Sequence, residues 1–214
     1  GLGDVYKRQD KMSKSKGNVI YADTLAELFG VDGVRYYALS EMPYASDGSI
    51  TYENIVSRYN TDLANNLGNL VNRTMAMTQK YFNGLVPSGG VLEPIDQELI
   101  AEAARAKENS YNCMEAYHIA DALEVIFALF RRANKYIDET APWVLAKDEQ
   151  QRKRLGTVLY NLLETIRIGA VLLTPFLPAT AENILNQLNT DAKDYKSLTS
   201  FGGLVSVSYT HLRA

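Results

Sequence analysis

The feature that most constrains this chain is a spacing of three or four residues between apolar side chains, which persists from Thr51 to Asn83 and Gly84. An α-helix gathers residues at this spacing on one face, whereas a strand would require strict alternation. Asparagine followed by glycine is a common way to end a helix. The pattern therefore predicts one helix of about 30 residues, whose buried stripe consists of Ile55, Tyr59, Leu63, Leu67, Leu70 and Met75.

Four further helices follow a Gly/Pro linker at residues 87–94. Apolar periodicity predicts them over residues 96–114, over residues 118–138, around residues 155–170, and from Pro178 to Leu188. Proline disfavours helical backbone in the residue before it, so Pro142 and Pro175 should interrupt the pattern. The sequence predicts a mainly α fold, with these helices packed as a bundle over residues 51–190.

Residues 10–50 have a different character and predict a small α/β segment ahead of the bundle. A polar loop leads into a short extended run at residues 19–21. A helix should begin at Thr24, which has Glu27 three residues later as in a capping box, and should stop at Gly30. Asp32 should cap a second short helix over residues 33–40, where it could pair with Arg35 across one turn.

The composition excludes several classes of protein. Hydrophobic residues make up 46% and charged residues 22%, which is ordinary for a globular domain and too balanced for a disordered chain. No apolar run reaches the length of about 18 residues that spans a bilayer, and no signal peptide opens the sequence, so a cytoplasmic location is expected. Cys113 is the only cysteine, so no disulfide within the chain and no cysteine pair for zinc can form, and we expect no metal site.

A net charge of −3 gives no general attraction to nucleic acid, so any RNA contact must be local. Local positive charge occurs in a loop at residues 11–18, with the sequence Lys-Met-Ser-Lys-Ser-Lys-Gly-Asn. Three ammonium groups and two hydroxyls within eight residues could gather around a polyphosphate. A solvated Lys/Ser loop would have the same composition, so the residues alone leave both interpretations open.

A possible base-reading surface lies on the long helix. Asn65, Asn69 and Arg73 are four residues apart, which places two amides and a guanidinium along one stripe. Such groups can hydrogen-bond splayed RNA bases, and Trp143, beside Pro142, offers a plane on which a base could stack. The alternatives are a solvated helix face for the stripe and a buried core position for the tryptophan.

These motifs resemble a known family. The loop at residues 11–15 matches the lysine-containing motif of class I aminoacyl-tRNA synthetases, and residues 30–37 are similar to a Gly-x-Asp-x-x-Arg-Tyr stretch in many of them. Residues 60–73, residues 134–143 and the Pro-Phe-Leu-Pro of residues 175–178 resemble the anticodon-binding domain of methionyl-tRNA synthetases, in the same order. The resemblance covers about residues 10–200 and places the chain in the C-terminal part of such an enzyme.

The resemblance implies roles for individual residues. Lys14 would contact the ATP phosphates while pyrophosphate departs, Lys11 would assist, and Ser13 and Ser15 would line the same ATP site, with Mg²⁺ accompanying the nucleotide. The implied partners are tRNA(Met), with methionine and ATP as the other substrates of the full enzyme. The residues implied to read the cytosine of a CAU anticodon are Asn69, Arg73 and Trp143, with Asn65 and Pro142 beside them.

The sequence also departs from the family. The His-Ile-Gly-His motif of the class is missing, because the only histidines are His118 and His211, so this fragment should be inactive alone. Residues 1–9 do not fit and are expected to be a non-native leader, and residues 191–214 form a tail whose last residues are expected to be non-native. The alternatives are another class I synthetase, a non-catalytic RNA-binding or scaffold protein derived from a synthetase, and a plain helical bundle.

Overall fold

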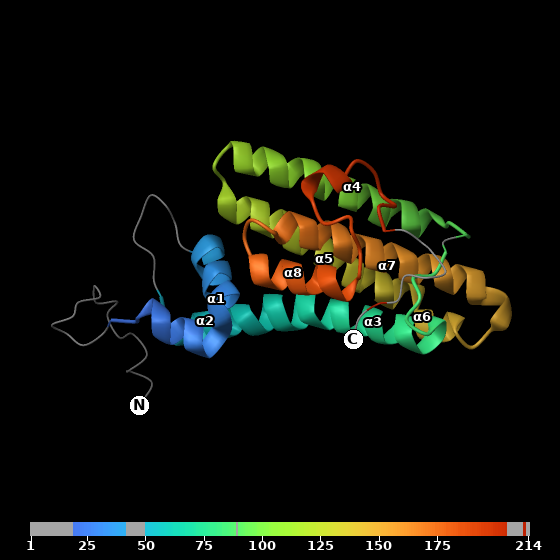
Figure 1. The fold of residues 1–214 in the computed structure, drawn as a ribbon, viewed down its shortest axis with the longest axis horizontal. Helices are drawn as coiled ribbons and strands as arrows, with labels where there is room; N and C mark the ends of the chain where they lie inside the picture. Colours follow the sequence, from blue (N-terminus) through green and yellow to red (C-terminus); the bar gives the residue numbers. More distant parts are fainter. Residues whose placement is uncertain (1–18, 42–49, 89, 205–211, 213–214) are drawn as a thin grey trace, which may run out of the picture.

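The computed structural model describes residues 19–41, 50–88, 90–204 and 212, and these form an elongated helical bundle with a kinked helix at one end (Figure 1). The mainly α fold is confirmed. The kinked helix is α1 (Ala22–Glu41), and the longest bundle helices are α4 (Pro94–Glu115), α5 (Ile119–Thr140) and α7 (Arg152–Leu173). The described residues contain no β-strand, so the expected α/β character is not found in residues 19–41.

The predicted helix of residues 51–83 is a continuous helical run, but its hydrogen bonding changes along its length. It comprises α2 (Tyr52–Arg58), a π-helix η2 (Tyr59–Gly68) and α3 (Asn69–Phe82). The Thr51 hydroxyl accepts a hydrogen bond from the Asn54 amide at 3.1 Å and caps the start. Left-handed backbone at Asn83, with φ of 53°, ends it as the sequence predicted. The π-helix was not predicted, because the apolar spacing tolerates either hydrogen-bond register.

The centre of the bundle is α7, which packs against α4, α5 and α8 (Pro178–Gln187). By length and composition, residues Glu149–Leu173 could cross a membrane, but 94% of the apolar stretch is buried inside the protein. The helix also buries Arg154, Glu164 and Arg167 with bonded partners. The apolar composition of α7 is therefore explained by its position in the core of the bundle.

Two networks of buried polar groups fasten this core. Arg154 on α7 donates to both carboxylate oxygens of Asp96 on α4, at 2.6 and 3.0 Å, and Tyr136 on α5 donates to the same carboxylate. Burial alone would raise the pKa of Asp96, but the hydrogen bonds from Arg154 and Tyr136 hold it below its usual range. Burial also raises the pKa of Tyr136, and its hydrogen bond to Asp96 adds to this effect.

The second network ties the segment after α8 to α7. Glu164 is fully buried, forms an ion pair of 2.8 Å with Arg167, and accepts hydrogen bonds from the amides of Gly202, Gly203 and Leu204 at 2.8–2.9 Å. A side chain at position 203 would meet the Arg167 guanidinium, since an added Cβ would lie 2.5 Å from Nη2. Glycine there allows the backbone to approach the pair closely.

The predicted details of α1 need correction. The helix begins at Ala22, and the Leu25 amide donates to the Tyr21 carbonyl at 3.1 Å, so Thr24 lies inside the first turn and is not the cap. The predicted break at Gly30 is present as a kink, where φ is 72° and ψ is 159°. This backbone conformation favours glycine because it has no Cβ.

Asp32 and Arg35 do not pair with each other, contrary to the prediction. Asp32 Oδ2 accepts a hydrogen bond of 2.6 Å from the Thr180 amide in the first turn of α8. Arg35 donates to the Phe176 and Pro175 carbonyls at 2.7 and 3.0 Å. The free amides and carbonyls at helix ends require partners, and a charged side chain from another element satisfies them well. Both residues therefore fasten α1 to the α7–α8 turn.

Candidate nucleic-acid interface

The nine predicted site residues fall into two groups. Lys11, Ser13, Lys14 and Ser15 lie outside the described residues. The other five lie on the helical run η2–α3 and at the connection between α5 and the short helix α6 (Pro142–Leu145). The geometry of the candidate interface therefore concerns Asn65, Asn69, Arg73, Pro142 and Trp143.

Asn65 and Asn69 are exposed on the helical run, one on η2 and the other at the start of α3. Neither carboxamide has a hydrogen-bond partner within the described part of the chain, so both keep a donor and an acceptor for a ligand. The register of the predicted stripe is altered, because Asn65 lies on π-helix and the assumption of 3.6 residues per turn holds only from Asn69 onward.

Two other asparagines hold the π-helix against α5. The Asn66 side chain donates to the Phe127 carbonyl at 3.3 Å, and Asn134 donates to the backbone and side-chain oxygens of Asn66 at 2.9 and 3.0 Å. Asn66 and Asn134 therefore bridge η2 and α5. Because Asn66 is buried among these contacts, its neighbour Asn65 faces solvent. π-Helical segments occur frequently at functional sites.

Arg73 connects α3 to the end of α5. Its guanidinium Nη2 lies 3.2 Å from Oδ1 of Asp138, and 32% of the Arg73 side chain and 66% of the Asp138 side chain remain exposed. Such an exposed pair contributes little stability, about 0–1 kcal/mol, but it holds the guanidinium beside the α5–α6 corner. Sequence reasoning missed Asp138 because the two residues are 65 positions apart and no local spacing links them.

The corner itself presents Trp143. Ala141 ends α5 with left-handed backbone, φ 42° and ψ 61°, an uncommon conformation for a residue with a side chain. Pro142 is buried at the first position of α6, where a missing amide proton costs nothing. Trp143 is 41% exposed, which excludes the alternative of a core position.

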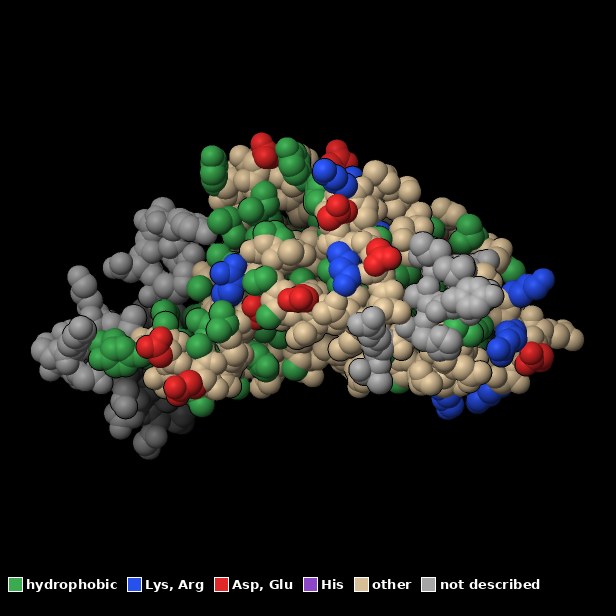
Figure 2. All heavy atoms as spheres, in the orientation of Figure 1, with side chains coloured by type: hydrophobic (Ala, Val, Ile, Leu, Met, Phe, Trp, Pro, Cys, Tyr) green, Lys and Arg blue, Asp and Glu red, His purple; other side chains and the backbone are tan. Residues whose placement is uncertain are grey.

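Positive charge is present near one end of the helical run η2–α3, although the net charge of the whole chain is −3 (Figure 2). Figure 2 shows Lys and Arg side chains gathered on the end of the molecule where α3 ends and α7 begins. Arg152 lies there, with its guanidinium 4.9 Å from the Phe82 ring centroid and a hydrogen bond of 3.4 Å to the Tyr81 carbonyl. Exposed cations at this end of α3 and α7 are suited to the phosphate backbone of a nucleic acid.

Two models of known protein families match this chain. Residues 4–75 match the family model "tRNA synthetases class I (M)", and residues 86–204 match "Anticodon binding domain of methionyl tRNA ligase". The methionine–tRNA ligase of Clostridium tetani is 54% identical over 193 residues, which is 90% of this chain and 30% of that protein. The ligase of Clostridium perfringens is 52% identical over 196 residues, covering 92% of this chain and 30% of that protein.

Solved structures agree as well. The methionyl-tRNA synthetase of Mycobacterium tuberculosis in complex with methionyl-adenylate superimposes with a TM-score of 0.84 at 39% identity, over 95% of this chain and 40% of that one. Its apo form gives a TM-score of 0.81 at 38% identity, over 92% of this chain and 40% of that one. The chain spans about 30% of the length of the curated relatives it matches. By sequence and by fold, this chain belongs to the methionyl-tRNA synthetase family.

Proposed function

We propose that this chain is the tRNA-reading portion of a methionine–tRNA ligase and that its α3 and α6 surface recognises the CAU anticodon of tRNA(Met). The observation that carries the proposal is the exposed Trp143 on α6, together with Arg73, whose ion pair with Asp138 holds its guanidinium at the last turn of α5. The indole would stack on a splayed base, while the guanidinium and the Asn69 carboxamide would bond its edge. Asn65 and Pro142 would support these contacts.

A second part of the proposal concerns activation of methionine. In the parent enzyme, methionine attacks ATP to form methionyl-adenylate and pyrophosphate, and a ribose hydroxyl at the tRNA end then takes the methionyl group and releases AMP. Lys14 would stabilise the negative charge that moves onto the departing pyrophosphate, with Lys11, Ser13 and Ser15 beside it and Mg²⁺ accompanying the ATP. This part rests on the order of residues in the loop and on the family match.

These 214 residues should not form the adenylate by themselves. A His-Ile-Gly-His motif requires two closely spaced histidines, and the chain has only His118 and His211. His118 immediately precedes α5, where its imidazole is exposed and lies 3.5 Å from the Asp121 carboxylate. The proposed contribution of this chain is therefore anticodon docking, together with the lysine loop, in a cytoplasmic enzyme.

The test is binding of the purified chain to an anticodon stem-loop carrying CAU, beside a matched stem-loop whose first anticodon base is changed. Both measurements need one stated salt concentration, because affinity for RNA varies steeply with salt. We expect clear preference for CAU. Equal affinity for the two RNAs by a folded chain would contradict the proposal and would favour a non-catalytic scaffold derived from a synthetase.

A further inference from the structure

The stripe of α3 that carries Asn69 and Arg73 continues to Lys80. An α-helix completes three turns in about 11 residues, so Lys80, which is eleven positions after Asn69, returns to the same side of the helix. At a rise of about 1.5 Å per residue, Lys80 lies roughly 10 Å further along the axis than Arg73. The side of α3 that is proposed to read bases therefore ends in an ammonium group.

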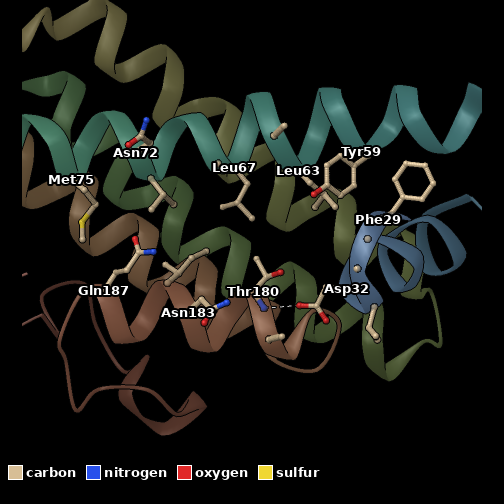
Figure 3. A pocket seen from close by; sticks show the side chains of 18 residues that line it. Phe29, Asp32, Tyr59, Leu63, Leu67, Asn72, Met75, Thr180, Asn183 and Gln187 are labelled. Carbon is tan, nitrogen blue, oxygen red and sulfur yellow. Dashed lines mark hydrogen bonds between the residues drawn. The ribbon is translucent and has the colours of Figure 1, made fainter. Parts of the chain in front are cut away.

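Helix α8 packs along a different side of the same helical run. Figure 3 shows Leu67 and Met75 pointing toward α8, and both side chains line the cavity between the two elements. Met75 is six positions after Asn69, which places the two side chains about 120° apart around the helix axis. Asn69 and Lys80 are exposed, so the stripe stays open along α3.

A second cation lies at the same end of α3. Arg152 is the first residue of α7 and is exposed, and its guanidinium carbon lies 4.9 Å from the centroid of the Phe82 ring. Its Nη2 lies 3.4 Å from the Tyr81 carbonyl oxygen. The Lys80 ammonium lies 5.3 Å from the centroid of the Tyr81 ring. Because aromatic faces attract cations, these two adjacent rings help to hold both charges at the end of α3.

Arg152 differs from the other exposed arginines in its partners. The structure describes four exposed arginines, and Arg58, Arg105 and Arg131 each form an ion pair with a glutamate. Within the described residues Arg152 has no carboxylate partner, and its contacts are a ring and a carbonyl. A guanidinium with free N–H groups matches the geometry of a phosphate, to which it can donate two parallel hydrogen bonds.

The acidic side chains of the neighbouring turn do not cancel these charges. Residues 147–153 contain two lysines and two acidic residues besides Arg152. One of the acidic residues, Asp148, already accepts a hydrogen bond from the Gln150 amide. Lys80 and Arg152 therefore supply an excess of positive charge at this end of the molecule, where Figure 2 shows Lys and Arg side chains gathered.

We infer that Lys80 and Arg152 form a phosphate site for the RNA strand whose bases Asn69 and Arg73 read, so that α3 contacts bases near its start and backbone at its end. The Arg152 guanidinium would donate to two oxygens of one phosphate, and the Lys80 ammonium would contact a neighbouring phosphate. The inference rests on the proposed function, because the bound anticodon places the strand along α3. The site adds affinity without sequence preference, since the phosphates are the same for every base.

The test separates phosphate contacts from base reading by the salt dependence of affinity. Binding of the 214-residue chain to the CAU stem-loop, and to the stem-loop with a changed first base, is measured from about 50 to 200 mM KCl. Each phosphate contact releases a counterion, so Arg152→Gln should lower the slope of log K against log [salt] by about 0.7–0.9. Its affinity near 0.15 M salt should fall about five-fold for both RNAs, which leaves the preference for CAU unchanged.

Further variants and matched controls make the test specific. Lys80→Gln should lower the slope as Arg152→Gln does, and the double variant should lower it about twice as much. Arg152→Lys keeps the charge and should retain the slope. The controls are Arg105→Gln on α4 and Lys196→Gln in η4 (Tyr195–Ser197), which remove exposed cations elsewhere and should change neither slope nor affinity.

A chemical substitution in the RNA locates the contact. Each phosphate of the CAU stem-loop is replaced in turn by an uncharged methylphosphonate. At one position the replacement should weaken binding by the unaltered chain and cause no further loss in Arg152→Gln. Equal losses in the two proteins at every position would overturn the inference.

The salt dependence gives further outcomes that would overturn the phosphate site. They are an unchanged slope in either single variant, an equal decrease in the two controls, and a loss of CAU preference in Arg152→Gln, which would assign this residue to base reading. Equal affinity of the unaltered chain for both RNAs is a different result. It would contradict the proposed function, whereas the difference in slope between the unaltered chain and Arg152→Gln would still measure the phosphate contact.

Discussion

Trp143 is a large aromatic residue that remains partly exposed at the start of α6. A tryptophan that is 41% exposed contributes less to the core than a buried one, and the backbone before it adopts a left-handed conformation at Ala141. Backbone strain of this kind persists only where the surrounding structure enforces it, and it occurs often at functional sites. At the scale of single residues, the proposed site therefore depends on an exposed tryptophan that follows a left-handed helix end.

Trp143→Ala should weaken binding to the CAU stem-loop by about 5- to 150-fold, because stacking of a base on an aromatic ring contributes about 1–3 kcal/mol. The exposed ring adds little to the core, so the helical circular dichroism spectrum should be unchanged. Trp143→Phe keeps an aromatic plane and should retain part of the affinity. Undiminished binding by Trp143→Ala would remove the tryptophan from the proposed site.

Arg73→Ala should lower the discrimination between CAU and a stem-loop with a changed base by about ten-fold, the usual effect of losing a hydrogen bond to a charged group. Stability should change by less than about 1 kcal/mol, because the Arg73–Asp138 pair is exposed. Arg105→Ala removes an arginine of the same charge from the exposed pair with Glu102 and serves as the control. A similar loss in both variants would indicate only a general effect of charge.

At the scale of helices, the bundle is joined by polar contacts as well as by its apolar core. Arg154 on α7 and Tyr136 on α5 both bond Asp96 in the first turn of α4, and this carboxylate also accepts from the Glu93 amide at 2.7 Å. The Asp96 carboxylate therefore links α4 to α5 and α7, and it also caps the start of α4. Removing one partner of a buried ion pair is far more damaging than removing an exposed one, because the other charge is left without compensation.

Asp96→Asn should lower the free energy of unfolding by about 3–5 kcal/mol at neutral pH. The pKa of Asp96 is depressed in the folded state, so its contribution is present above the unfolded value of about 4 and is lost as pH falls through the folded value. Urea denaturation at pH 7 and pH 3 should show a smaller acid-induced loss in Asp96→Asn than in the unaltered chain.

Glu98→Gln, which changes an exposed carboxylate on the same helix, provides the control for this measurement. It should leave both the stability at pH 7 and its decline toward pH 3 nearly unchanged. If Asp96→Asn lost as much stability on acidification as the unaltered chain, the depressed pKa of Asp96 would not be a source of the pH dependence.

At the scale of the whole molecule, contacts of charged side chains join segments that are distant in the sequence. Asp32 and Arg35 fasten α1 to the α7–α8 turn, about 140 residues later in the chain. Glu164 and Arg167 fasten residues 190–204 to the middle of α7. Asp32 and Arg35 therefore help to fix the position of α1 relative to the bundle. Glu164 and Arg167 do the same for residues 192–204 on α7.

Glu164→Gln should release residues 202–204, because the neutral amide leaves Arg167 as an uncompensated buried charge and offers these backbone amides one acceptor oxygen in place of two. We expect a loss of about 3–5 kcal/mol in the free energy of unfolding and faster hydrogen exchange at these amides. Glu182→Gln, on the exposed side of α8, is the control. Unchanged exchange at Leu204 in Glu164→Gln would show that other contacts hold the segment.

The sequence by itself determined the helices, because a three-or-four spacing of apolar residues and the stops at Asn83, Pro142 and Pro175 act over one or two turns. It also marked the exposed amides of Asn65 and Asn69 as candidates. Only the tertiary structure decided the partners of charged groups, since Arg73 meets Asp138 and Asp32 meets Thr180 across long sequence separations. It also decided the π-helix, where Asn66 forms hydrogen bonds with α5. A helix depends on interactions between residues a few positions apart, so a local pattern can predict it. The Arg73–Asp138 ion pair and the cap that Asp32 provides for α8 exist only when distant segments are packed together.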